Sequence, residues 1–352
     1  MYSEADIEAA VRAGVLPPET AAKFRAFVTA NQMSPAVDEE YVRLLTGFND
    51  IFVSIAIALV AIATYVLASG PAPRGLYLAA EAWALAEYFT RRRRMALPSI
   101  LLLLIYAGGV WLTLLSLVGG WMIGHMMLFM PMVGRLAQAG LDTKSRIYLT
   151  MGFTAGLEAL AIYGHWRRFH VPITVAACMA AVVLLVISLV LGFAPGLLPF
   201  WPYLLILGGG CVFALALRWD MSDRARRTRR ADVAFWLHLL AAPMLVHPAF
   251  HLLGLLQGGS DAQDAAIAVG LYVALAVVAL LVDRRALLVS ALGYVIYALA
   301  HVLHTAGSEA ESLAVTALIA GCVLLLLSAF WHRARAALLA LLPAALTQNL
   351  PA

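Results

Sequence analysis

Long apolar runs recur from residue 51 almost to the end of the chain. The first reads IFVSIAIALVAIATYVLAS and contains no charged residue. About 20 apolar residues in a helix cross the ~30 Å hydrocarbon core of a bilayer. The runs lack the apolar–polar alternation of barrel strands, and a helix satisfies its own backbone hydrogen bonds in lipid. The pattern predicts an all-α polytopic transmembrane bundle of about ten spans, at 51–69, 75–90, 96–119, 147–163, 172–193, 201–217, 231–256, 265–282, 286–305 and 313–330.

The two ends of the chain differ from this bundle at 51–330. Residues 1–50 predict a short cytoplasmic helical hairpin, in which Gly14 ends the first helix and the Pro17-Pro18 pair starts the second. Residues 331–352 begin with basic side chains and continue as an apolar stripe that Pro343 interrupts. About twelve residues before a proline cannot span the membrane, so this segment predicts an amphipathic tail in the bilayer interface.

Residues 120–146 break the regular series of spans. The segment GWMIGHMMLFMPMVG is apolar enough to enter the bilayer, but one complete crossing here would move Arg167-Arg168 to the outer face. Its glycines and Pro131 supply the breaks that a re-entrant element needs, and such an element survives when protein shields it. We therefore expect a re-entrant or an interfacial segment.

Composition and charge narrow the class of protein. Hydrophobic residues make up 63% of the 352 and charged residues 12%, against about 25% charge in soluble domains. The net charge is +4, yet seven acidic residues against four basic ones precede Leu45. Phosphates would repel such a hairpin, so we expect no nucleic-acid binding and instead a protein partner for residues 1–50. The bundle itself is expected to contact the lipid bilayer.

Pairs of arginines recur before four of the spans with the pattern RRxx[LV]. The copies begin at Arg93, Arg167, Arg229 and Arg284, and they predict four hairpins that each turn on an arginine pair; the alternative is that any tight cytoplasmic turn is basic. With ten spans and a cytoplasmic amino terminus, twenty of the 24 lysines and arginines lie inside. The positive-inside rule therefore predicts a multi-pass protein of the cell inner membrane with both termini in the cytoplasm.

Four histidines are candidates for chemistry near the outer face. His247 and His251 lie 18 and 22 residues beyond Arg229, and His301 and His304 lie 17 and 20 residues beyond Arg284. At ~1.5 Å per residue the two pairs reach similar depths, and each pair shares a helix face. Imidazoles from neighbouring helices can bind a transition metal or a haem iron. The alternative is that they form hydrogen bonds at the interface.

Acidic residues within the spans form a second group of candidates. Glu87 and Glu158 are expected to pair with arginines at the cytoplasmic boundary, Glu158 with Arg167 among them. Glu81 is deeper and has no evident partner nearby in the sequence. An intramembrane carboxylate is costly to bury, which makes Glu81 a candidate for proton or ion transfer.

Three segments carry a resemblance to a known group of proteins: IEAAVRAGVLPPETAAKFRAF at 7–27, GFNDIFVSIAIAL at 47–59, and ALLALLPAALTQNLPA at 337–352. With them the chain resembles the bacterial membrane proteins of unknown function that have an amino-terminal helical hairpin. The resemblance implies a layout and a bacterial origin, but no catalytic residue and no cofactor.

Three classes of function stay open from the sequence. A transporter or channel is slightly favoured; the alternatives are an assembly subunit of a larger membrane complex and a metal- or haem-dependent enzyme that uses the histidines. The chain contains no P-loop, GxSxG or HExxH motif, so enzymatic activity is not the favoured prediction.

Overall fold

The computed structural model describes residues 7, 10–24, 48–128, 143–223, 228–255, 262–285, 288, 292–293, 295–296 and 309–343. The chain divides into two compact units, Met1–Arg43 and Leu44–Ala352. In the first unit, residues 10–12 and 18–24 are helical, and Gly14 between them has a φ of +70°. This left-handed conformation ends the first helix, as predicted. The hairpin as a whole stays a prediction.

The described residues of the second unit form helices and no strand. Their bounds are α3 Phe48–Leu67, α4 Pro71–Ala86, the π-helix η1 Glu87–Arg92, α5 Ala96–Leu128, α7 Thr143–Phe169, α8 Ile173–Phe193, the 3-10 helix η2 Pro195–Phe200, α9 Trp201–Ser222, α10 Arg229–Leu252, α11 Ala262–Val282 and α13 Glu309–Ala340. Among the described residues, seven helical stretches are long and apolar enough to cross a membrane, in α3, α5, α7, α8, η2–α9, α10 and α13. The chain is therefore a helical apolar bundle compatible with an integral membrane protein.

Three predicted spans account for the difference between ten and seven. The α4 helix has 16 residues, and the apolar part of α11, Ala266–Val282, is also short for a crossing. Most of the predicted ninth span, 286–305, lies outside the described residues. The number ten accordingly stays a prediction.

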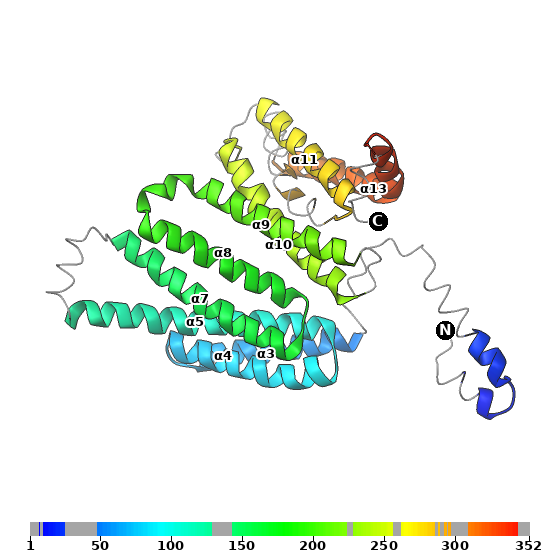
Figure 1. The fold of residues 1–352 in the computed structure, drawn as a ribbon, viewed down its shortest axis with the longest axis horizontal. Helices are drawn as coiled ribbons and strands as arrows, with labels where there is room; N and C mark the ends of the chain where they lie inside the picture. The colour runs from blue at the N-terminus through cyan, green and yellow to red at the C-terminus, as the bar shows by residue number, and fades with distance from the viewer. Residues whose placement is uncertain are drawn as a thin grey trace. The chain divides into compact units, whose positions relative to one another are not determined.

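Helices that follow one another in sequence pack as hairpins (Figure 1). The pairs are α4 with α5, α7 with α8, and α9 with α10. Arg94, His170 and Asp283 have φ values of 54°, 53° and 56°, and each lies at a turn beside an arginine pair. Left-handed backbone outside glycine is uncommon, so these turns share an unusual local geometry. The first two hairpins thus reverse direction beside the arginine pairs, as predicted.

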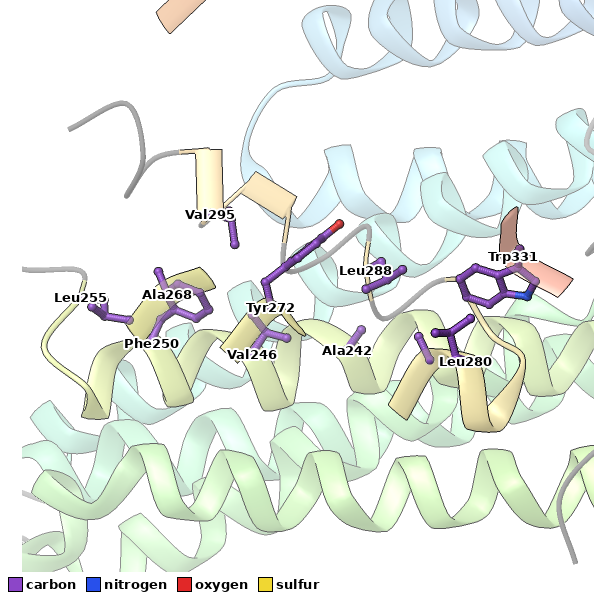
Figure 2. Packing of buried hydrophobic residues seen from close by; sticks show 11 residues of the cluster. Ala242, Val246, Phe250, Leu255, Ala268, Tyr272, Leu280, Leu288, Val295 and Trp331 are labelled. Carbon is purple, nitrogen blue, oxygen red and sulfur yellow. The ribbon is translucent and has the colours of Figure 1, made fainter. Parts of the chain in front are cut away.

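One core cluster joins α10, α11 and α13. Figure 2 shows Val246 and Phe250 of α10 facing Ala268 and Tyr272 of α11, with Trp331 of α13 at the far end of the cluster. Since α13 runs unbroken through residue 331 to Ala340, the last predicted span and the start of the predicted tail are one helix.

Small residues bring α4 and α5 unusually close together. A Cβ placed on Gly109 would lie 2.6 Å from the carbonyl oxygen of Gly75 and 2.8 Å from the amide nitrogen of Ala79. Helices in lipid associate through such close backbone contacts, because apolar side chains gain little by leaving a lipid environment. The contact fixes α4 against α5 and so positions Trp83 and Tyr106, which belong to the site described below.

The segment 120–146 is described only at its two ends. The α5 helix continues through Gly119, Gly120 and Gly124 to Leu128, and α7 begins at Thr143. Residues 129–142 lie outside the described residues, so the expectation of a re-entrant or interfacial segment is not tested.

Candidate functional site

Polar side chains occupy the buried face of α7. Thr154, Glu158 and His165 are all buried, together with the apolar residues Ile162 and Phe169 of the same helix. Steps of three or four residues return to the same side of a helix, so these positions form one continuous stripe. The stripe runs along a helix that is apolar and long enough to span the membrane.

Four buried polar atoms of this stripe have no hydrogen-bond partner among the described residues. They are Thr154 Oγ1, Glu158 Oε2 and both ring nitrogens of His165. Leaving a buried donor or acceptor unsatisfied costs about 1–3 kcal/mol, more for a charged group. Structural polar residues in a bundle normally find such partners. The stripe is therefore a candidate functional site rather than a packing feature.

Aromatic rings from three helices surround His165. Its ring centroid lies 4.6 Å from that of Phe169, 5.3 Å from that of Tyr106 on α5, and 5.9 Å from that of Trp83 on α4. The hydroxyl of Tyr106 donates to the carbonyl oxygen of Ala161 at 3.4 Å, between the levels of Glu158 and His165 on α7. The rings hold the imidazole in place through packing and leave both of its nitrogens available for proton transfer.

The expectation that Glu158 pairs with an arginine is wrong. Its carboxylate is buried on the α7 stripe, whereas the guanidinium of Arg167 donates to the hydroxyl of Tyr163 on the exposed side of the helix. Nine residues separate Glu158 from Arg167, which places the two side chains two and a half turns apart. Among the three candidate carboxylates, Glu158 is thus the one that is buried without an arginine partner in the described ranges.

Glu81 has a partner that its sequence neighbourhood does not reveal. The hydroxyl of Thr64 on α3 donates to Glu81 Oε2 at 2.5 Å, and the carboxylate is only half-buried. Glu81 joins α3 to α4 by this hydrogen bond. Its predicted role in proton or ion transfer is not tested by this contact.

Glu87 pairs with arginines as predicted. Arg168 donates to its two carboxylate oxygens at 2.6 and 3.0 Å, and Arg91 donates at 3.2 Å. The hydrogen bond from Arg168 holds the pKa of Glu87 below its ordinary value. This group lies in η1, outside the seven apolar spans, and the ion pair ties the turn of the first hairpin to the end of α7.

A buried ionic network that the sequence analysis missed joins α9, α10 and Arg284, which lies two residues after the end of α11. His238 Nε2 lies 2.8 Å from Asp220 Oδ2, and Arg284 Nε donates to the same oxygen at 3.2 Å. The Arg284 Nη2 group also bonds Asp220 Oδ1. Arg284 was expected in an exposed turn, but it is buried with its partners. An aspartate at the end of an apolar helix was the available signal, but nothing in the sequence identified its partner 64 residues away.

A neighbouring contact extends this network to α13. The indole nitrogen of Trp331 donates to Asp283 Oδ1 at 2.7 Å, and Arg335 Nε donates to the carbonyl oxygen of Leu280 at 3.2 Å. The side chains that follow α11 are therefore held from two sides. We assign this network a structural role, because Asp220 is paired with both His238 and Arg284 where α9, α10 and the segment after α11 meet.

The predicted histidine cluster is only partly described. His247 and His251 both pack on Trp201, at centroid distances of 5.9 and 5.0 Å, while His301 and His304 lie outside the described residues. Within the described part of the chain, no group of three or more histidine, cysteine or acidic side chains could hold a metal ion. The prediction of a metal or haem site at these four histidines is not tested.

Comparisons with protein-family profiles, curated proteins and solved structures found no match to this chain. The resemblance to bacterial membrane proteins with an amino-terminal hairpin stays a prediction.

Proposed function

We propose that the chain is an integral membrane protein of the transporter and channel class that moves protons along the buried face of α7. The proposal includes a bacterial inner-membrane location with both termini in the cytoplasm, which the distribution of lysines and arginines supports. One observation carries the functional part: Glu158 lies within an apolar span and His165 lies near the end of that span that bears the arginines, and both have buried polar atoms that no described group satisfies.

Protons would pass between these groups through intervening water, because Glu158 and His165 are seven residues, or about 10 Å, apart along one face of α7. Thr154 and His165 are eleven residues apart, which is roughly 16 Å along the helix and about half of the ~30 Å hydrocarbon core. Glu158 lies between them, and Tyr106 reaches α7 at Ala161, between Glu158 and His165. A carboxylate, a phenol and an imidazole can each accept and release a proton, and chains of such groups are typical of intramembrane proton relays.

A purely structural subunit fits this stripe less well. An assembly protein would gain stability from an apolar or fully hydrogen-bonded interior, because each unsatisfied buried polar group destabilises the fold. The Asp220–His238–Arg284 network has such mutual bonds and the α7 stripe does not. The concentration of four unsatisfied polar atoms on one helix face favours a functional role for the stripe.

Replacing Glu158 with glutamine is expected to abolish proton movement. The purified protein would be reconstituted into vesicles that contain a pH-sensitive dye, with a potassium ionophore to prevent charge build-up. After an external acid step, wild-type protein should collapse the pH gradient faster than protein-free vesicles. In the variant, the rate in excess of protein-free vesicles should fall at least roughly tenfold, because an essential proton carrier is removed.

Glu87→Gln is the matched control, because it removes a carboxylate that is paired at the helix ends. It should keep the wild-type rate, and His165→Phe, which preserves ring packing against Phe169, should lose it. Wild-type vesicles that behave like protein-free ones, or an unchanged rate in the Glu158 variant, would refute the proposal.

A further inference from the structure

Arginines and tyrosines gather at the adjoining ends of α4–η1 and α7, and we infer that they bind the headgroups of anionic phospholipids. We call this surface the arginine–tyrosine rim. Its members are Tyr88, Arg91, Arg92, Arg93, Tyr163 and Arg167. All six are exposed.

The same pair of side chains occurs on both helices of the rim. Arg93 donates from Nε and Nη2 to the hydroxyl of Tyr88, at 3.2 and 3.1 Å, and its guanidinium lies 5.5 Å from the centre of that ring. Arg167 donates to the hydroxyl of Tyr163 at 3.3 Å, and its guanidinium lies 6.0 Å from the ring centre. Each guanidinium is thereby held beside a tyrosine at a helix end.

An ion pair holds the two halves of the rim together. Arg168 of α7 bonds both carboxylate oxygens of Glu87 in η1. Glu87 is the one acidic residue in the segments 87–94 and 163–168, which contain six arginines. The pairing therefore fixes the geometry of the rim and leaves it with a large excess of positive charge.

The chemistry of the rim fits a phosphate at the surface of a bilayer. Tyrosine is enriched at the membrane interface, where the ring contacts acyl chains and the hydroxyl contacts headgroups. The planar guanidinium donates two parallel hydrogen bonds to phosphate oxygens, and basic clusters beside membrane helices attract anionic lipids. A soluble phosphate would use only the arginines, whereas a phospholipid also uses the apolar faces of the tyrosines. We assign the rim to the lipid.

The test is a titration of phosphatidylglycerol into the full-length protein, purified in mild detergent, with the melting temperature as the readout. The melting temperature of the wild-type protein should rise with phosphatidylglycerol but not with phosphatidylcholine, and salt should weaken the rise. The double variant R93Q/R167Q should need about tenfold more phosphatidylglycerol for the same rise, since two phosphate contacts are lost.

The double variant R229Q/R230Q is the matched control. These two arginines are also an exposed pair, at the start of α10, and within the described part of the chain neither bonds to a tyrosine. The control should respond as the wild type does. An equal loss in both double variants, a wild-type response in R93Q/R167Q, or an equal rise with inorganic phosphate would overturn the assignment.

Discussion

Replacing Asp220 with alanine should destabilise the folded protein by about 3–5 kcal/mol, because it leaves the buried guanidinium of Arg284 without the carboxylate that neutralises it. The same change removes the acceptor of the His238 imidazole. Both losses fall where α9, α10 and the end of α11 meet, so the packing of three helices depends on this carboxylate. The measurement is the melting temperature in mild detergent, with unfolding monitored by tryptophan fluorescence.

Two further variants separate this charge effect from general damage. Asp223→Ala removes a carboxylate three residues away, which is partly exposed and accepts from the backbone and hydroxyl of Thr228; we expect a loss of about 1 kcal/mol at most. The double variant D220L/R284M removes both buried charges and should be more stable than D220A alone. Equal melting temperatures for D220A and D223A would contradict the assignment.

Replacing Gly109 with alanine should destabilise the α4–α5 hairpin by about 1–3 kcal/mol, since a new methyl group would overlap backbone atoms of α4. The nearest of them, the carbonyl oxygen of Gly75, would be 2.6 Å away. Backbone atoms cannot rotate aside as a flexible side chain can. The helices would have to separate, and Trp83 and Tyr106 would move away from His165 with them.

The adjacent glycine provides a matched control. A Cβ on Gly108 would meet nothing within 4 Å, so Gly108→Ala should be neutral or stabilise the helix by about 0.5–1 kcal/mol through alanine's better helix propensity. Both variants add the same methyl group, and they do so at neighbouring positions. If they melt at the same temperature, the close contact between α4 and α5 is not as described.

The positions of several helices could be predicted from apolar runs alone. The predicted span 172–193 corresponds to α8 at Ile173–Phe193, and 265–282 corresponds to α11 at Ala262–Val282. Such runs end at charges or prolines, which mark the end of an apolar crossing even where the helix itself continues, as α13 does beyond Trp331. Both signals are visible without knowledge of neighbouring helices.

The partners of the buried polar groups could not be predicted in this way. When a helix is apolar on most sides, the sequence does not show which side faces the interior of the bundle. It therefore did not reveal that Glu158 faces inward rather than toward the arginines. Arg284 resembled the other arginine pairs, yet it is buried against Asp220. The sequence also did not reveal that α13 continues through Trp331 into the predicted tail, or that the indole of Trp331 donates a hydrogen bond to Asp283. Each of these depends on a contact between helices distant in sequence.

Thiol labelling of reconstituted protein tests the central claim most directly. If water fills the buried polar path, a buried cysteine on that path should react faster than an exposed cysteine that faces lipid. Single cysteines would replace Thr154, which is 0% exposed, or Leu160, which is 67% exposed, in a chain whose Cys178, Cys211 and Cys322 have been changed to alanine. With a small water-soluble thiol reagent, we expect T154C to react at least roughly tenfold faster than L160C, because lipid around residue 160 excludes water and so prevents formation of the thiolate. Faster reaction of L160C, as burial alone would dictate, would contradict it.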